Sequence, residues 1–378
     1  MSISFSKHNS SFRKIETLLS TIEHHSSLKN CTIQSIDFSN VHIDWHQIDL
    51  ENAVFLGCSF HPADKSYLLD QDAIIFPKVT SLPYQPYRTR LYTWQELMDG
   101  YNPEFDQSKD LEIYEYFTQY KLNPPINEAL YQRIHDHAID NALRDYIVLQ
   151  DNGLTKKRCI GVMGGHSTPR TDPFYRKVAQ TAKLLTEQGY TIASGGGPGI
   201  MEAANLGGYF AFQPDSTLGE VLEMLQVAPR YTDRDYIVQA QYVIEKYPQG
   251  QESLAIPTWY YGHAPSNLYA SHIAKYISNS IREDTLLAIS LYGVIFAPGS
   301  AGTIQEIFMD AAQNHYGSFN FLSPMVFLGK EWYEIESMIY PLLKKLSYGK
   351  RYHDLLFLTD DPKRITQFIQ NHPPVPNP

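Results

Sequence analysis

The chain has 378 residues, of which 43% are hydrophobic, 19% charged and 13% aromatic, and its formal net charge is -10. This is the composition of a globular protein that is long enough for more than one hydrophobic core. The acidic balance and the lack of a long basic run make a nucleic-acid polymer a poor candidate partner. Cys31, Cys58 and Cys159 lack the spacing of a disulfide framework or a zinc site.

Neither the start of the chain nor its interior predicts a membrane segment. The first residues, MSISFSKHNSSFRK, lack the apolar core of a signal peptide. The most apolar stretch, Leu286 to Pro298, is too short to span a bilayer. We therefore expect a soluble cytoplasmic protein with no membrane partner.

Residues 1–75 combine a helical pattern with a five-residue period. Apolar side chains on one face of residues 10–24 predict an amphipathic helix. Apolar pairs such as Cys31-x-Ile33 then recur every five residues, and after two extra residues the period resumes at Ile48 and continues to Phe60. This period resembles the pentapeptide repeat, whose repeats each form one side of a square β-helix, although two or three ordinary strands remain an equal alternative. Either structure would be a docking or capping element without chemistry of its own.

Residues 76–155 are rich in proline and tyrosine and are predicted to form a connector that wraps the surface. Short helices are expected near Trp94–Met98 and Leu111–Gln119. A longer helix is expected over residues 126–150, where Asp151-Asn152-Gly153 supplies a stop signal.

Residues 156–378 alternate between short apolar strands, glycine-rich turns and helices. The predicted strands are Cys159–Met163, Tyr190–Ala193, Gly293–Ala297 and Phe321–Leu328. The predicted helices are Pro173–Gln188, Ile200–Leu206, Ile304–Asn314 and Trp332–Leu346. This order predicts an α/β fold with a Rossmann-like, doubly wound parallel sheet, which binds ligands at the carboxyl ends of its strands. The stretch at about 210–270 is interpreted as an insertion that covers part of the site.

Three loops at the predicted strand ends have the character of anion-binding loops, because glycines admit a close ligand and the following helix offers free N–H groups. Their candidate ligand-binding residues are Gly164, Gly165 and Ser167, then Gly195, Gly196, Gly197 and Gly199, then Gly299, Ser300, Gly302 and Thr303. Neither a P-loop nor the usual dinucleotide fingerprint is present. The three loops together predict a site for a phosphate or a nucleotide.

Two segments resemble a known family. Residues 194–205, SGGGPGIMEAAN, resemble the GGGPGIMEAAN signature of the LOG ("lonely guy") phosphoribohydrolases. Residues 298–306, PGSAGTIQE, resemble the PGGxGTxxE signature of that family. Larger bacterial nucleotide 5′-monophosphate nucleosidases carry the same signatures after a long N-terminal extension. The resemblance extends over about residues 156–345.

The resemblance implies that the substrate is a nucleoside 5′-monophosphate, cleaved at its N-glycosidic bond to a free base and ribose 5-phosphate. It implies a homodimer or a dimer-based assembly. It also assigns catalysis to Glu306, which ends the second signature, and to Arg282 upstream of it. Glu202 matches a family glutamate and would contact ribose hydroxyls or cap its helix. No cofactor and no metal are expected, and no lysine is marked for the pyridoxal phosphate that the older label of lysine decarboxylase would need.

The chemistry agrees with those roles. Breaking a ribosyl–base bond builds positive charge on the sugar, which a carboxylate can stabilise while it orients or deprotonates the attacking water. Glu306 is predicted in the first turn of a helix, where the helix dipole would keep it ionised. Arg282 could hold the phosphate or the ribose, or orient that glutamate.

Two residues depart from the family pattern. Ser300 replaces the second glycine of PGG, and Glu283 replaces the lysine that commonly follows the family's arginine. Both favour an alternative function, a nucleotide-binding or sensing module without catalysis. The aromatic residues at 259–261 either stack on a base or fill a local core.

Overall fold

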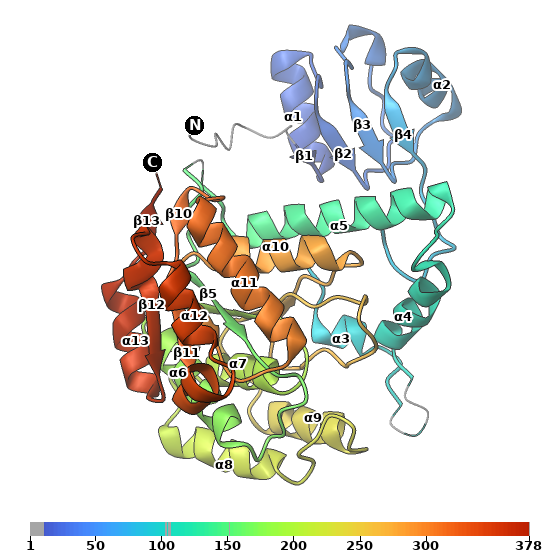
Figure 1. Ribbon diagram of the computed structural model, residues 1–378. Helices are drawn as coiled ribbons and strands as arrows, with labels where there is room; N and C mark the ends of the chain where they lie inside the picture. The colour runs from blue at the N-terminus through green and yellow to red at the C-terminus, as the bar shows by residue number, and fades with distance from the viewer. Residues whose placement is uncertain (1–10, 103, 105–106, 151, 378) are drawn as a thin grey trace. The chain divides into compact units, whose positions relative to one another are not determined.

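The computed structural model describes residues 11–102, 104, 107–150 and 152–377. Residues 1–10, on which much of the signal-peptide expectation rests, lie outside this part of the chain. The chain divides into two compact units (Figure 1). One runs to Arg90 and includes Pro124–Leu143, and the other contains Leu91–Asn123 and the chain from Arg144 onward. The helix α5 (Ile126–Ile147) contributes to both.

The first unit is a coil of parallel strands. Its strands are β1 (Ser11–Phe12), β2 (Thr32–Gln34), β3 (Val54–Leu56) and β4 (Ile74–Phe76), which pair in that order. Thr32 pairs with Val54, and Val54 with Ile74. Parallel neighbours cannot be joined by a hairpin turn, so each step is one circuit of the coil. The predicted pentapeptide-like β segment is therefore confirmed.

Side chains in the coil follow its period. The inward members of the apolar pairs, including Ile33, Phe38 and Phe55, are almost fully buried. At one corner Asn30, Asn52 and Asp72 all adopt a left-handed backbone with φ of 55 to 59°, which asparagine and aspartate tolerate better than most residues. The Asn52 Nδ2 donates to the Asn30 Oδ1 at 3.1 Å across 22 residues of sequence. Helices α1 (Ile15–His25) and α2 (Pro62–Asp70) bury Leu18 and Leu68 respectively, and a 3-10 turn spans Trp45–Gln47.

The second unit is built on a seven-stranded parallel sheet with the order β12-β11-β9-β5-β6-β7-β8. Its strands in chain order are β5 (Cys159–Met163), β6 (Thr191–Ser194), β7 (Leu254–Ala255), β8 (His272–Ile273), β9 (Val294–Phe296), β11 (Met325–Leu328) and β12 (Leu356–Thr359). Parallel strands with helices on both faces confirm the predicted Rossmann-like fold class.

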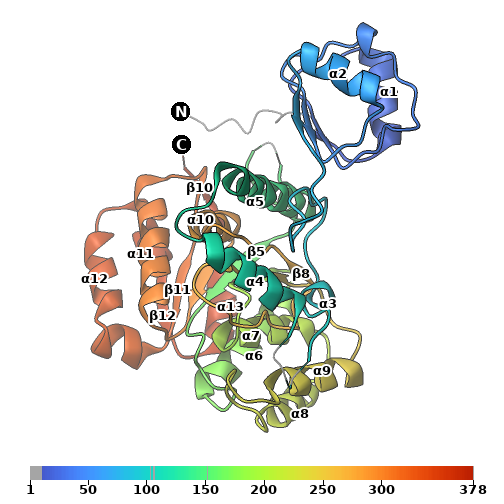
Figure 2. The ribbon, with the colours of Figure 1, turned by 90° about the vertical axis from the view of Figure 1, so that its right-hand side faces the viewer.

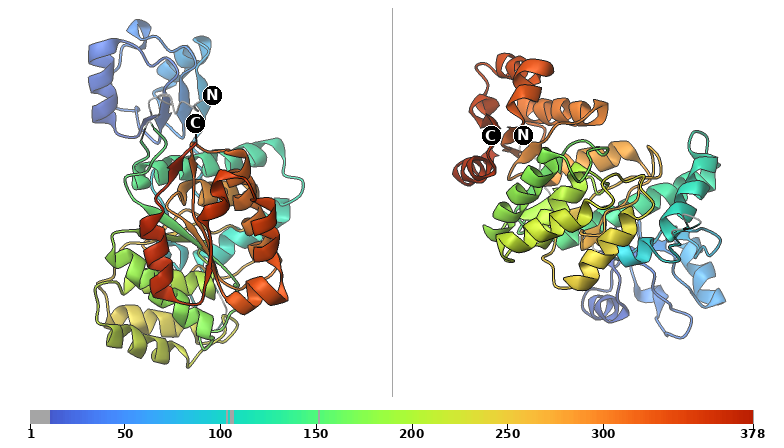
Figure 3. Two further views of the ribbon diagram at one scale, coloured as in Figure 1. Left: turned by 60° about the vertical axis from the view of Figure 1, so that its left-hand side comes forward. Right: turned by 90° about the horizontal axis from the view of Figure 1, so that it is seen from below.

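Helices cover both faces of this sheet (Figure 3). One face carries α6 (Pro173–Glu187), α7 (Ile200–Tyr209) and α13 (Pro362–Asn371). The other carries α10 (Asn279–Ile289), α11 (Ala301–Tyr316) and α12 (Ile339–Leu346). Helices α8 (Asp215–Leu225) and α9 (Tyr236–Lys246) pack together near α7 (Figure 2). Two shorter pieces, α3 (Trp94–Leu97) and α4 (Lys109–Tyr120), come from the predicted connector. Within the described residues, no helix is long and apolar enough to cross a membrane.

Two predicted elements are wrong in detail. The helix expected over Trp332–Leu346 is a π-helical turn (Glu331–Glu336) followed by α12, because Met338 between them has a left-handed φ of 55°. The strand expected over Phe321–Leu328 is two strands. The first, β10 (Phe321–Leu322), pairs with β13 (Val375–Pro376) outside the large sheet. A short 3-10 helix, Arg351–Leu355, precedes β12.

The strand order reverses beside β5. The chain steps outward from β5 through β6 and β7 to β8, then returns to place β9 on the other side of β5. Such a switch point leaves a crevice outside the carboxyl ends of the strands, where α/β sheets bind their ligands. The loops that follow β5, β6 and β9 meet there.

Candidate functional site

The glycine loops pack directly against one another. The Gly165 N–H donates to the Pro298 carbonyl at 3.0 Å, and the Ile200 N–H donates to the Gly165 carbonyl at 3.1 Å. Gly199 has a φ of +67°, and a Cβ there would lie 2.4 Å from the Gly165 carbonyl oxygen. A Cβ on Gly164 would meet Ile200 at 2.6 Å. Gly164, Gly165 and Gly199 thus allow close packing of the loops, which is a structural reason for glycine beside the predicted ligand contact.

The β6 loop makes room for an arginine. A Cβ on Gly195 would lie 2.4 Å from Nη2 of Arg282. Gly196 has a φ of +76°, and its N–H donates to the Ser194 hydroxyl at 3.0 Å. Gly197 is half-buried beside Met201. The absence of a side chain at Gly195 lets the guanidinium lie over the strand end.

The third loop, residues 299–303, leaves the N-terminus of its helix open to solvent. Helix α11 begins at Ala301, and its first internal bond runs from the Ile304 N–H to the Ser300 carbonyl at 3.1 Å. The N–H groups of residues 301–303 therefore lie ahead of the first internal hydrogen bond of the helix and can bind an anion. Gly302 is exposed, and a Cβ added to it would meet no atom of the described residues within 4 Å, whereas Gly299 lies against Thr303.

Ser300 fits this loop without strain. Its φ is -97°, a conformation open to any L-residue, and its side chain is exposed and makes no cap hydrogen bond within the described part of the chain. The replacement of glycine by serine therefore leaves the α11 N-terminus accessible.

Arg282 and Glu306 form an ion pair at this edge of the sheet. Nη1 of Arg282 lies 3.0 Å from Oε1 of Glu306, and their side chains are only 9% and 12% exposed. The Arg282 Nε donates to the carbonyl of Ile256, just after β7, at 2.7 Å. The arginine is thus fixed by the backbone at one end and presents the carboxylate at the other.

The expectation that the helix dipole would control Glu306 is wrong. Because α11 begins at Ala301, Glu306 lies in its second turn and not in its first. Burial raises the pKa of Glu306 above its ordinary value, while the charge and hydrogen bond of Arg282 lower it and the charge of Glu283 raises it further. Desolvation outweighs the dipole because the dipole acts only over the first turn.

Glu283 is nearly buried and is held by two neighbours. It accepts hydrogen bonds from Gln305 Nε2 at 2.8 Å and from the Tyr261 hydroxyl at 3.4 Å. The residue after Arg282 is thus an acid that lies close enough to Glu306 to affect its proton affinity.

Glu202 lies at the centre of a buried cluster. It accepts from Arg170 Nη2 at 2.6 Å and from Arg170 Nε at 2.9 Å. The Tyr175 and Tyr236 hydroxyls also donate to it, at 2.6 and 2.7 Å. Arg170 further donates to the carbonyls of Ala228 and Tyr236, both at 3.2 Å. Glu202 therefore anchors the segment that precedes α9, a role that sequence reasoning missed because no pattern links Arg170 to it.

Ser167, the remaining candidate in the loop after β5, lies at the edge of the candidate site. Ser167 is exposed, and within the described residues its side chain has no hydrogen bond that would fix it. Beside it, the His166 ring lies 5.9 Å from the ring of Tyr231. This contact places the β5 loop next to the segment leading into α9.

Trp259 belongs to a core. It is 1% exposed, and its Nε1 donates to Oδ1 of Asp110 at 2.8 Å. The ammonium of Lys275 lies 2.7 Å from the same carboxylate oxygen. Tyr260 and Tyr261 remain 37% and 66% exposed. Asp110 comes from the predicted connector, to which the sequence assigned no chemistry.

Among the described residues, no group of three or more His, Cys, Asp or Glu side chains is placed to hold a metal ion.

Comparisons with known proteins add little. No protein-family model matches the chain, and no curated protein matches it. Two solved structures align over 57% of this chain at 15% identity. The Moco carrier protein of Chlamydomonas reinhardtii is covered over 100% of its length with a TM-score of 0.35, and the structural-genomics target TM1055 over 99% with a TM-score of 0.36. Likeness at this level carries no inference about function.

Proposed function

We propose that the protein is a phosphoribohydrolase that cleaves nucleoside 5′-monophosphates to a free base and ribose 5-phosphate. The observation that supports this most is the Arg282–Glu306 pair, at 3.0 Å, on the helices that flank the switch point. A nearly buried carboxylate beside an open helix N-terminus combines an anion site with a group that suits a developing ribosyl cation.

Each part of the site has a role in the proposed reaction. The N–H groups at the start of α11 bind the 5′-phosphate, together with Ser300, Gly302 and Thr303. Phosphate binding positions the C1′–N bond so that binding energy is used for orientation. Glu306 stabilises the cationic sugar and takes a proton from the attacking water, whose oxygen bonds to C1′ as the C1′–N bond breaks. The base leaves with the electron pair of that bond, and the proton taken by Glu306 passes to the base, so that a neutral free base is released and the carboxylate is restored. Arg282 holds the carboxylate in place.

The reaction is tested by incubating the purified protein with AMP, GMP, CMP and UMP and identifying the products by chromatography. The proposal expects free base and ribose 5-phosphate in equal amounts. Nucleoside with inorganic phosphate would indicate a phosphatase and contradict it.

The second candidate, a nucleotide-binding module without catalysis, is favoured by the buried acid Glu283, whose charge opposes ionisation of Glu306. Calorimetric binding of a monophosphate with no product of either kind would select that function.

A further inference from the structure

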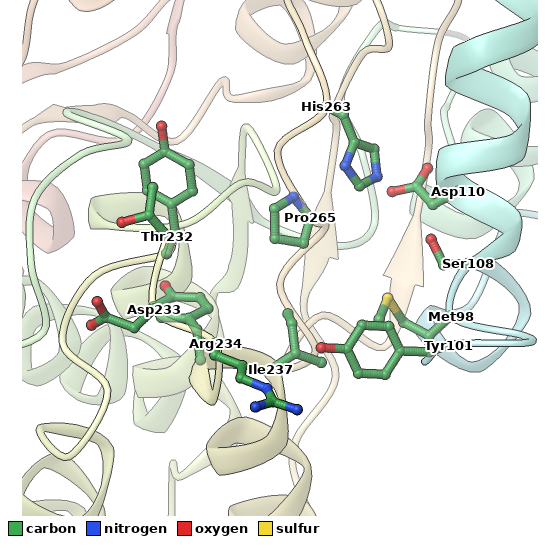
Figure 4. A pocket seen from close by; sticks show the side chains of 12 residues that line it. Met98, Tyr101, Ser108, Asp110, Thr232, Asp233, Arg234, Ile237, His263 and Pro265 are labelled. Carbon is green, nitrogen blue, oxygen red and sulfur yellow. The ribbon is translucent and has the colours of Figure 1, made fainter. Parts of the chain in front are cut away.

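A cavity of about 380 Å³ lies within the second unit, and Figure 4 shows the side chains that line it. This volume is in the range of pockets that hold small organic ligands. Its walls come from the residues before α4, the segment leading into α9 and the loop at 263–265. The lining residues on which the following argument depends are Tyr101, Asp110, Tyr231, Arg234, His263 and Pro265.

Three contacts tie this cavity to the loops after β5 and β6. The ring of Tyr231 lies tilted beside that of His166 in the β5 loop, with ring centroids 5.9 Å apart. Tyr236, also in the lining, donates from its hydroxyl to Glu202 of α7, the helix that follows the β6 loop, at 2.7 Å. Two residues after Pro265, Asn267 donates from its N–H to the Gly196 carbonyl at 2.8 Å and from Nδ2 to the Gly197 carbonyl at 3.3 Å. The β5 loop in turn contacts the loop before α11, since the Gly165 N–H donates to the Pro298 carbonyl at 3.0 Å.

The lining suits a flat ring that carries a hydrogen-bond donor. Tyrosine and histidine rings with Pro265 offer faces for stacking. On one wall lie the Asp110 carboxylate and the His263 ring, and the Arg234 guanidinium lies on the opposite side (Figure 4). A carboxylate accepts hydrogen bonds only, so its partner on a ligand must donate.

Hydrogen bonds hold the accepting group, the Asp110 carboxylate, in a fixed position. Asp110 is fully buried, with Lys275 at 2.7 Å and Trp259 Nε1 at 2.8 Å, and Lys275 also donates to Ser266 at 3.1 Å. These bonds leave part of the acceptor capacity of the two carboxylate oxygens unused. A preformed acceptor of this kind discriminates between ligands, because a donor placed there gains a hydrogen bond to a fixed charged group, which a ligand without that donor lacks.

We propose that this cavity receives the nucleobase, and that Asp110 selects bases with an exocyclic amino group. This inference rests on the proposed function, since it assumes that the bound ligand is a nucleoside monophosphate. AMP and purine riboside 5′-monophosphate form a matched pair of probes, because they differ only in the amino group at C6 and share the ring nitrogens, ribose and phosphate.

The test measures equilibrium binding by calorimetry in Glu306→Gln, so that turnover does not interfere. AMP should bind at least about tenfold more tightly than purine riboside 5′-monophosphate, since a hydrogen bond to a charged group is worth about 1.5–3 kcal/mol. The double variant Asp110→Asn/Lys275→Met removes both buried charges together and should bring the two affinities within about twofold. Tyr101→Leu, which removes a ring from the wall, should weaken both nucleotides. Ribose 5-phosphate, which has no base, should bind equally to all of these proteins.

Equal binding of AMP and purine riboside 5′-monophosphate by the parent protein would overturn the inference, as would unchanged AMP affinity in both cavity variants. An equal loss of ribose 5-phosphate affinity would also overturn it, because the substitutions would then act through the fold. A different outcome would contradict the proposed function and leave the cavity assignment standing: the wild type binds AMP with this selectivity but releases no base.

Discussion

Two acids on neighbouring helices, Glu283 on α10 and Glu306 on α11, set the protonation of the site. The charge of Glu283 and burial both raise the pKa of Glu306, and Arg282 opposes them. A catalytic carboxylate must be ionised to accept a proton, so the rate of base release should rise with pH. The midpoint of this rise, the acid limb of the pH profile, should lie above pH 4.5, the ordinary pKa of glutamate.

Glu283→Gln removes one of the charges that raise the pKa of Glu306. We expect the acid limb of kcat/KM to move to lower pH while the plateau at higher pH stays near that of the wild type. The measurement is a pH profile of base release for both proteins. Glu245→Gln, on the exposed part of α9, serves as the control and should leave the limb in place. A limb that moves to higher pH in Glu283→Gln contradicts the assignment.

At the scale of elements, the loops after β5 and β6 are held by backbone contacts that only glycine permits. Gly199→Ala places a Cβ 2.4 Å from the Gly165 carbonyl oxygen on a residue with φ of +67°. We expect the free energy of unfolding to fall by about 1–3 kcal/mol. Urea denaturation measures it.

Gly219→Ala is the matched control. Gly219 lies inside α8, and a Cβ there would meet no atom of the described chain within 4 Å. Alanine should stabilise the helix by about 0.5–1 kcal/mol. If the two substitutions changed the midpoint of unfolding equally, loop packing would not explain Gly199.

At the scale of the whole molecule, buried acids shape the dependence of stability on pH. Asp310 is 2% exposed, and its Oδ2 has no hydrogen-bond partner among the described residues. Burial raises its pKa well above 3.8. The folded state therefore keeps a proton that the unfolded state releases, so this stabilising contribution is present below pH 3.8 and is lost as pH rises toward the raised pKa.

Asp310→Asn removes the ionisation while keeping the shape of the side chain. The variant should gain stability relative to the wild type on going from pH 5 to pH 8, as measured by urea midpoints at both values. Asp235→Asn, at an exposed position, should show no such gain. A difference between Asp310→Asn and the wild type that does not change with pH contradicts the prediction.

Much of the architecture follows from periodicity. The five-residue period of residues 31–60 indicated either a pentapeptide-like coil or ordinary strands, and the structure has the coil. The strand–glycine–helix rhythm predicted the parallel sheet, because the rhythm expresses a burial pattern that local sequence carries. Strands of two residues such as β7 and β8 were missed, since such short segments have no period.

The site was predictable only in part. Motifs singled out the loops, Arg282 and Glu306 as candidates, and the structure places Arg282 and Glu306 in contact. The partners of Glu202 and the Asp110–Lys275 pair could not be predicted from the sequence. Asp110 and Lys275, for example, are separated by 165 residues, and only the fold brings them together. The burial that raises the pKa of Glu306 was missed for the same reason.

In the proposed reaction, Glu306 performs the chemistry of N-glycosidic cleavage. This claim is tested by the rate of ribose 5-phosphate release from AMP by the wild type and by Glu306→Gln, with AMP binding measured in both. We predict that kcat falls by about 10²–10⁴-fold while binding persists. Equal kcat in the two proteins would contradict the claim.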